Sequence, residues 1–402
     1  MLPKPFSRRE VLSGLAIGAV GAAMGSPQGG DSVQMVPTES MIGTIRALRD
    51  RAHQELSNRL QAGRLARGDG YLYTVDAAQF MICLAQLGDH DKYVLLRDHC
   101  VKNLIRDRRD DPYTRGFVPW RYKRGEEPDA SGTTEALRVA KGLWLGSRIF
   151  NNPADADWVR IILGGYRTHA TVDQGIWIVR NYFVFRTRAF ANNSFLVDYD
   201  PDLIREIADA THDVDLATLA DSCLKSVQLS VAPCGLLYDL IQPELMTLYP
   251  ELPMIAFSPN DVVGIANTGT TALGVARQAP ELVRAIIRFA LLNDGNLRRY
   301  YLGRSGRPAH DSPAAVCEYA VLVRLAVALN DADAVNRLLN RALEQWHWIA
   351  DRPERCDAFL YGEMLAATIA VLDWSAGLSA PQSFLQSVDP PAGATMRVFP
   401  TS

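Results

Sequence analysis

Four acidic residues lie where a predicted helix begins after a loop, a position from which a carboxyl group can reach into a cleft. They are Asp76, Asp129, Glu135 and Asp261. Two such carboxyl groups can serve as general acid and general base, the chemistry by which many glycosidases cleave a sugar linkage. The same positions also suit helix caps or first-turn acids that complement the helix dipole. The residues alone leave both interpretations open.

Aromatic side chains accompany these acids, and the apolar face of a pyranose ring stacks well on an aromatic plane. Three other acids, Asp311, Glu318 and Glu363, occupy places analogous to those of the four candidates. We predict that substrate is bound by five aromatic residues and one further acid. These are Trp120, Tyr122, Trp177, Tyr182, Tyr238 and Asp239.

Other chemistries find no support in the sequence. The seven histidines show no zinc-type spacing, and neither a Gly-x-Ser-x-Gly elbow nor a phosphate-binding glycine loop occurs. We therefore expect no metal and no cofactor. A net charge of −3 without a basic stripe argues against a nucleic-acid partner. The six cysteines are scattered through apolar helical patterns, so we expect buried thiols rather than a disulfide framework.

The elements that must position these residues are almost all helical, and they come in pairs. Turns of about two to six residues join the members of a pair, as in antiparallel helical hairpins. The expected helices are 39–64, 74–87, 91–106, 131–150, 155–169, 200–210, 215–231, 261–277, 280–292, 313–329, 331–348 and 359–374.

Long connections alternate with these short turns, at 107–130, 170–199, 232–260 and 294–311. Short turns at one end and long loops at the other predict an all-α fold, an (α/α)6 toroid of about twelve helices in two rings. No fixed sequence period recurs, which disfavours an open solenoid. Residues 175–185 alternate in a β-like manner, and we expect them to form a small β-hairpin in a loop at the barrel mouth.

The N-terminus carries an export signal. Its Ser7-Arg8-Arg9 sequence precedes Leu12 and an apolar run, and it resembles the bacterial twin-arginine motif. The run is too short for a stable membrane span, which needs about 20 apolar residues. We predict a signal peptide and linker over 1–37, the toroid over 38–377 and an irregular tail over 378–402. The resemblance implies export by the twin-arginine machinery to the periplasm or beyond, with no stable membrane span after the signal is removed.

Several segments resemble the cellulase-type family 8 glycoside hydrolases and, more broadly, the six-hairpin glycosidases. Residues 192–210 are similar to the family's Asn-Pro-Ser-Tyr-Leu-x-Pro segment and the helix that follows it. Residues 220–239 resemble a helix followed by Gly-x-x-Pro-Asp-Trp, and 130–144 resembles the Ala-Ser-Asp-Ala-Asp-Leu-Trp helix. Ser258 to Val263 matches Tyr-Asp-Ala-x-Arg, which implies a catalytic base or an essential acid at Asp261.

The chain also departs from that pattern. Val75 stands where the family places its catalytic glutamate, with Asp76 one position along. Gly132 replaces the aspartate of Ala-Ser-Asp, and the arginine after Asp261 is missing. Either a carboxylate has been relocated, with Asp129 or Glu135 serving, or the hydrolytic machinery is absent.

We therefore expect a secreted carbohydrate-active enzyme, a glycoside hydrolase whose substrate is a polysaccharide or oligosaccharide. Asp76 or Glu135 would protonate the leaving oxygen, and Asp261 or Asp129 would activate water. One alternative is a non-catalytic toroid that binds a glycan or a protein partner. Another is a polysaccharide lyase or epimerase on the same fold, for which the candidate residues are Tyr182, His169, Arg180 and His310.

Overall fold

A computed structural model describes residues 37–61, 65–173, 175–242, 261–350 and 356–377 of the chain. The predicted signal peptide with nearly all of its linker, and the predicted C-terminal tail, lie outside these residues. Within them, none of the helices has the length and apolar character that crossing a membrane requires. The same residues contain no cluster of three or more potential metal ligands.

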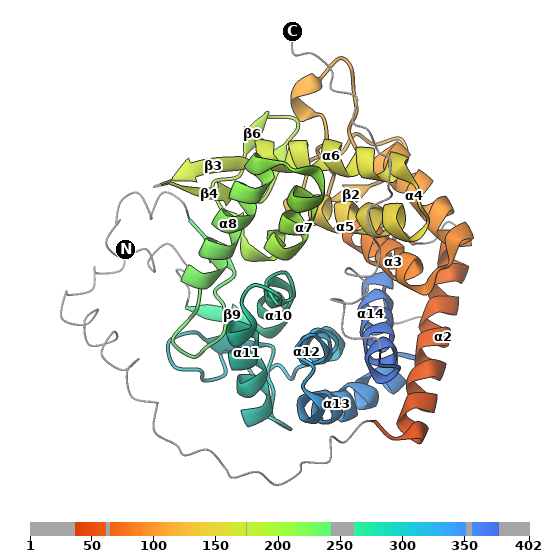
Figure 1. Ribbon diagram of the computed structural model, residues 1–402, viewed down its shortest axis with the longest axis vertical. Helices are drawn as coiled ribbons and strands as arrows, with labels where there is room; N and C mark the ends of the chain where they lie inside the picture. Colours follow the sequence, from red (N-terminus) through yellow and green to blue (C-terminus); the bar gives the residue numbers. More distant parts are fainter. Residues whose placement is uncertain (1–36, 62–64, 174, 243–260, 351–355, 378–402) are drawn as a thin grey trace, which may run out of the picture. The chain divides into compact units, whose positions relative to one another are not determined.

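Twelve α-helices are present in this part of the chain, and they confirm the predicted toroid (Figure 1). Five consecutive pairs form hairpins, and the last helix packs on the first and closes the ring. The helices are α2 (Glu39–Gln61), α3 (Thr74–Leu87), α4 (His90–Leu104), α5 (Thr133–Ile149), α6 (Pro153–Thr168), α7 (Pro201–Thr211), α8 (Val214–Leu229), α10 (Ile265–Leu273), α11 (Pro280–Leu292), α12 (Val316–Ala328), α13 (Ala332–Ala350) and α14 (Ala358–Ser375).

The inner ring consists of α3, α5, α7, α10, α12 and α14, and the partner of each lies outside it (Figure 1). The sequences explain this order. Helices α3, α12 and α14 bury residues on nearly every side, because each is surrounded by other helices. Helix α13 instead buries one stripe that includes Val335, Leu338 and Leu339, and it turns a charged face to solvent.

Two inner helices begin later than the sequence suggests. Residues Val262–Gly264 form strand β9, which pairs with β10 (Tyr300–Leu302), so α10 starts only at Ile265. Helix α12 starts at Val316 rather than at Pro313, because Pro313 bridges to Arg298. The carboxylate of Glu318 accepts a hydrogen bond from the Ala315 N–H at 2.9 Å and thereby closes this helix start.

The third hairpin is irregular. A 3-10 turn, η3 (Leu196–Asp198), contacts both α5 and α10 before α7 begins at Pro201. The turn therefore occupies part of the place that a longer inner helix would fill. Asp200 caps α7 by accepting a hydrogen bond from the Leu203 N–H at 3.1 Å.

The strands form small two-stranded sheets in the long connections. The predicted β segment at 175–185 contributes to two hairpins rather than one. The antiparallel pairs are β1 (Leu72–Tyr73) with β2 (Arg121–Tyr122), β3 (Ala170–Asp173) with β4 (Ile176–Val179), β5 (Phe183–Val184) with β6 (Ala189–Phe190), β7 (Ser194–Phe195) with β8 (Leu240–Ile241), and β9 with β10.

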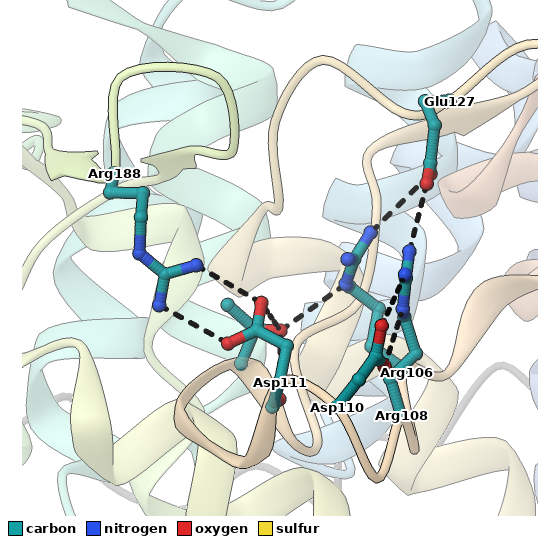
Figure 2. A network of polar contacts seen from close by, with 7 residues as sticks. Arg106, Arg108, Asp110, Asp111, Glu127 and Arg188 are labelled. Atoms are coloured by element: carbon teal, nitrogen blue, oxygen red, sulfur yellow. Dashed lines mark hydrogen bonds and ion pairs between the residues drawn. The ribbon is translucent and has the colours of Figure 1, made fainter.

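The connection between α4 and α5 is tied to its neighbours by a network of charges (Figure 2). Arg188, in the turn of the β5–β6 hairpin, donates to both carboxylate oxygens of Asp111 at 3.1 and 3.2 Å. Arg108 bridges Asp110 and Glu127, and Arg106 lies 3.7 Å from Glu127. The network joins three surface segments, and the same connection carries Trp120 and Asp129.

None of the six cysteines, all of which lie within the described residues, forms a disulfide. Cys83, Cys100, Cys223 and Cys356 are buried, whereas Cys234 and Cys317 are partly exposed. Burial raises the pKa of the Cys83 thiol to about 12, so it stays protonated and unreactive at neutral pH.

Candidate functional site

The segment that leads into α5 is held between two other extended segments. On one side, the Gly132 N–H donates to the Val118 carbonyl at 2.8 Å. On the other, the N–H groups of Ser131 and Phe185 donate to the carbonyls of Phe183 and Asp129 at 2.9 and 3.0 Å. This backbone pairing places two of the predicted acids, Asp129 and Glu135, on a supported frame.

Glu135 occupies the first turn of α5, and its side chain folds back toward the helix start. A Cβ atom on Gly132 would lie 1.9 Å from Glu135 Oε2, so the carboxyl group fills space that any side chain at Gly132 would claim. Glu135 is half-buried, and none of the described residues outside its own backbone donates a hydrogen bond or forms an ion pair with it. Burial raises its pKa to about 7, opposed by its own backbone N–H and by the charge of Arg138.

Asp129 lies close by in a contrasting environment. It is half-exposed, and its carboxylate accepts hydrogen bonds from Trp120 Nε1 at 2.7 Å and Arg121 Nη2 at 2.9 Å. Burial opposes ionisation, but these two donors outweigh it and lower the pKa of Asp129. The carboxylate is therefore ionised at neutral pH.

Trp120 connects the two acids. Its indole nitrogen holds Asp129, and its Cβ lies 3.4 Å from the Cβ position of Gly132, against which Glu135 folds. Neighbouring carboxyl groups with pKa values pushed in opposite directions are the usual basis for separate acid and base roles. This pair has that property.

Aromatic rings and arginines surround Trp120. The Arg121 guanidinium lies 4.2 Å from the ring centre of Tyr71 and 4.3 Å from that of Trp120. Tyr73 meets Trp120 edge-on at 5.5 Å and carries the Arg67 guanidinium 4.0 Å from its ring centre. Tyr71, Tyr73 and Arg121 were not predicted from the sequence, although the alternation Tyr71-Leu72-Tyr73 before a helix was a usable signal.

Tyr122 follows Arg121 in β2, and successive residues of a strand point to opposite faces. Its ring packs against the core and lies 5.9 Å from His99. Trp177 also packs partly against the core, and Tyr182 is 36% exposed. Among the described residues, none of these three rings makes an aromatic contact with Trp120. Their predicted roles in substrate binding stay predictions.

Asp76 is fully engaged in an ion pair. Arg67 donates through Nε and Nη2 to both carboxylate oxygens at 2.8 Å, and the Asp76 side chain has no exposed surface. Burial raises the pKa of Asp76, while Arg67 acts against the shift. The geometry supports a structural part for this carboxylate, because neither oxygen is free to reach a substrate.

Replacing Asp76 by Asn is expected to lower the free energy of unfolding by about 3 kcal/mol, because it leaves the Arg67 charge without its partner. Activity measured below the melting temperature is expected to change less than tenfold. Urea unfolding of D76N, R67M and the double variant checks the pair. The double variant should lose clearly less than the sum of the two single losses. Additive losses would show that the pair does not act as a unit.

Asp261 belongs to a second polar group, at the start of β9. Its backbone φ is +53°, and its carboxylate accepts from the Tyr238 hydroxyl at 2.8 Å and from the Arg304 N–H at 3.0 Å. Burial, together with this bond to Asp261, raises the pKa of Tyr238. Nearby, Asp239 accepts from Asn267 at 2.7 Å. None of these contacts reaches Glu135 or Asp129, so Asp261 lies apart from them. Asp76, in contrast, is linked to Trp120 through Arg67 and Tyr73.

Of the residues considered for lyase or epimerase chemistry, His169 and Arg180 lie together. His169 is buried, with Nε2 2.9 Å from the Ser131 hydroxyl and Nδ1 2.8 Å from the Gly165 carbonyl. Burial lowers its pKa to about 4, so it is neutral and enclosed at pH 7. Arg180 stacks on Phe190, and His310 lies near Tyr300. His169 also contacts the Phe190 ring, with the two ring centres 5.2 Å apart, and its carbonyl accepts a hydrogen bond from the Arg180 N–H at 3.0 Å, so His169 and Arg180 are neighbours.

Further along the inner helices, the buried Glu363 forms ion pairs with arginines of two other inner helices. Glu363 of α14 lies 3.4 Å from Arg138 Nη1 of α5 and 3.3 Å from Arg324 Nη1 of α12. Arg138 also approaches Gln79 Oε1 of α3 at 3.4 Å. Glu318, in the first turn of α12, has one carboxylate oxygen 3.7 Å from Arg299 Nε. Asp311 is exposed and forms an ion pair with Arg298. These acids are thus all paired with arginines.

Beneath this layer, all six inner helices line a cavity of about 230 Å³. Arg138 and Arg324 contribute to its wall, but Asp76, Asp129, Glu135 and Asp261 do not. The cavity wall on α5 runs from Thr134, the residue before Glu135, to Leu145. One end of the cavity therefore adjoins Glu135, although the Glu135 side chain does not line it.

No known family profile matches the sequence, and no curated protein sequence matches it either. Solved structures do. "A novel alpha-amylase from Clostridium perfringens" superposes with a TM-score of 0.61 and 14% identity, over 75% of this chain and 86% of that one. The endo-beta-1,4-glucanase CMCax from Acetobacter xylinum gives 0.53 and 15%, over 74% and 99%. Rex8A from Paenibacillus barcinonensis, complexed with xylose, gives 0.53 and 14%, over 76% and 84%.

What these proteins share with the chain is the (α/α)6 toroid. At such identities the likeness establishes the fold. The expected resemblance to glycosidase toroids is confirmed at that level, and the reaction has to be argued from the side chains of this chain.

Proposed function

We propose that the protein is a glycoside hydrolase acting on a polysaccharide, with Glu135 as general acid and Asp129 as general base. One observation carries the proposal: the two carboxyl groups flank one tryptophan, and their pKa values are shifted in opposite directions. The names of the structural neighbours support a carbohydrate substrate, since they include an amylase, a glucanase and a xylose complex.

In this reaction the protonated Glu135 donates its proton to the glycosidic oxygen as the bond to the anomeric carbon breaks. The ionised Asp129 takes a proton from the water that attacks the same carbon. Direct attack by water inverts the anomeric carbon, and inverting glycosidases separate the two carboxyl groups by about 6.5–9.5 Å. Retention would instead require Asp129 to act as a nucleophile, at a separation of about 5–5.5 Å. The anomer first released, followed by NMR, distinguishes the two courses.

The position of Glu135 accounts for the departures from the family 8 pattern. The chain has Val75 at the place of the family's acid and Gly132 at the place of an aspartate, and the Glu135 carboxyl occupies the space above Gly132. We infer that the acid function has moved to Glu135. Asp76 cannot take it over, because both of its oxygens are bound by Arg67.

Hydrolysis of a panel of β-glucans, chitosan and uronate polymers tests the proposal. Release of reducing ends from at least one polymer, lost in both Glu135→Gln and Asp129→Asn, is the expected result. Full activity in both variants would refute the assignment of these residues. Asp261→Asn is the matched control, since Asp261 lies in a separate polar group.

A non-catalytic glycan-binding toroid is the second candidate. Two observations favour it: Asp76 is engaged in an ion pair with Arg67, and Val75 stands at the position of the family's acid. Under this alternative, the same polymers bind without release of reducing ends. Trp120→Ala would then weaken binding, since ring stacking would supply much of the affinity.

We further propose that the chain is exported by the twin-arginine machinery to the periplasm or beyond. The motif at Ser7-Arg8-Arg9 supports this, and so do six cysteines without a disulfide, which require no oxidising compartment for folding. A reporter fused to residues 1–37 should be exported, and replacing Arg8 and Arg9 by Lys should abolish export. Export that survives this change would argue for another route.

A further inference from the structure

The cavity beneath Glu363 has an apolar wall and one carboxylate that the protein does not neutralise. The wall includes Leu145, Leu273, Val327 and Ala370. Asp373 of α14 also lines the cavity, and it has no hydrogen-bond or ion-pair partner among the described residues. A half-buried carboxylate without a partner is costly, which makes it a candidate for ligand recognition.

The other charges around the cavity are satisfied within the protein. Lys141 binds Asp200 at 2.8 Å, and Arg277 lies 3.2 Å from Glu206. Arg138 and Arg324 both bind Glu363. Each cationic side chain that lines the cavity is therefore already paired with another acid, and none of them forms an ion pair with Asp373.

Among the described residues, the cation whose charge acts on Asp373 is Arg49 of α2. Its Nε and Nη2 atoms donate to Asp50 at 2.8 and 2.7 Å, so the guanidinium is directed elsewhere. Burial raises the pKa of Asp373, and the charge of Arg49 offsets part of this rise. A bound cation would offset it further.

The helix ends add to the negative potential. Gln86, Leu273, Val327 and Asp373 belong to the final turns of α3, α10, α12 and α14, whose last carbonyls carry partial negative charge. None of these four helices has a basic residue in its last turn. Cationic side chains commonly stand there, so the cavity lacks a compensation that helices usually provide.

We propose that this cavity binds a small organic cation, an ammonium group on an apolar body, with the ammonium at Asp373 and the body against Leu145, Val327 and Ala370. The side-chain amide of Gln86, which has no partner among the described residues, supplies a second polar contact. The size is suitable, because an engineered apolar cavity of roughly 150 Å³ holds benzene and this one is about 230 Å³. The inference does not depend on the proposed hydrolysis, although one end of the cavity lies next to Glu135.

Calorimetric titration of the full chain with benzylamine tests the inference, with benzyl alcohol as the uncharged probe of the same body. Benzylammonium is expected to bind at least tenfold more tightly than the alcohol, because only the cation gains from Asp373. In Asp373→Asn this difference should vanish while weak binding of the alcohol remains. Asp209→Asn, an exposed change on α7, is the matched control and should keep the preference.

Ala370→Leu fills the cavity and should abolish binding of both probes. Its folding is checked by circular dichroism, and Asp373→Asn provides the second, milder variant. Equal affinity for amine and alcohol, an unchanged preference in Asp373→Asn, or no binding of either probe at millimolar concentration would each overturn the proposal. Binding is the readout, so failure of the hydrolysis proposal leaves this test unaffected.

Discussion

Replacing Glu135 by Gln is expected to lower kcat for polysaccharide hydrolysis roughly 100- to 10,000-fold, the usual contribution of a general acid. The amide is nearly isosteric with the carboxyl group that fills the space above Gly132, so the fold should persist. The variant loses the proton that Glu135, with a pKa of about 7, would deliver to the leaving oxygen. Steady-state kinetics on the best polymer of the panel measures the effect.

Glu318→Gln is the matched control for this experiment. Glu318 also stands in the first turn of an inner helix, but it already accepts a hydrogen bond from the Ala315 N–H, which an amide oxygen can still accept. Its kcat should stay within a few-fold of the parent value. Comparable losses in both variants would indicate general damage to the barrel rather than loss of the acid.

Replacing Gly116 by Ala is expected to produce the largest loss of stability, about 4 kcal/mol or more. Gly116 has a φ of +80°, and a Cβ atom there would lie 2.0 Å from the Ile161 carbonyl oxygen of α6. Gly165 faces it so closely that a Cβ on that residue would lie 2.4 Å from the Gly116 carbonyl carbon. The loop that carries Trp120 and Asp129 can pack on α6 only through these two glycines.

Gly125→Ala separates the two causes. Gly125 lies in the same connection with a φ of +84°, but a Cβ atom there meets nothing within 4 Å. The Gly125→Ala variant should therefore lose only about 1–2 kcal/mol of unfolding free energy, the conformational penalty of a left-handed residue with a Cβ atom. Denaturant unfolding of both variants gives the comparison, and a loss in Gly116→Ala no larger than that in Gly125→Ala would contradict the packing argument.

The ring of helices was predictable because an inner helix and an outer helix differ in how many sides they bury. The apolar surface of α14 and the single buried stripe of α13 are both visible in the sequence. The starts of α10 and α12 were not, because pairing across the chain determines them. Val262–Gly264 looks like the first turn of a helix until Tyr300–Leu302 pairs with it.

The sequence named Glu135, Asp129 and Trp120, but it could not select them from a longer set. Asp76 carries the same kind of signal, and only the three-dimensional position of Arg67 shows that both of its oxygens are engaged. The opposite pKa shifts of Glu135 and Asp129 likewise depend on burial and on donors from other segments. Local pattern contains neither kind of information.

The aromatic and arginine cluster around Trp120 illustrates the same limit. The sequence alone places Arg121 in a loop. In the structure its guanidinium stacks between Tyr71 and Trp120, because β1 and β2 pair. Tyr71 lies 49 residues before Trp120 in the chain, counted from their positions 71 and 120. Contacts at that separation are set by the assembled toroid.

The pH dependence of kcat/KM tests the central claim most directly, because it reports the essential ionisations of the free enzyme. Glu135 must be protonated to act, so activity should fall as the pH rises through about 7. Asp129 must be ionised, so the acid limb should lie below the usual aspartate pKa of about 3.9. Loss of the limb near pH 7 in Glu135→Gln, with only low residual activity, is the predicted result. An alkaline limb near pH 7 that persists unchanged in that variant would contradict the account.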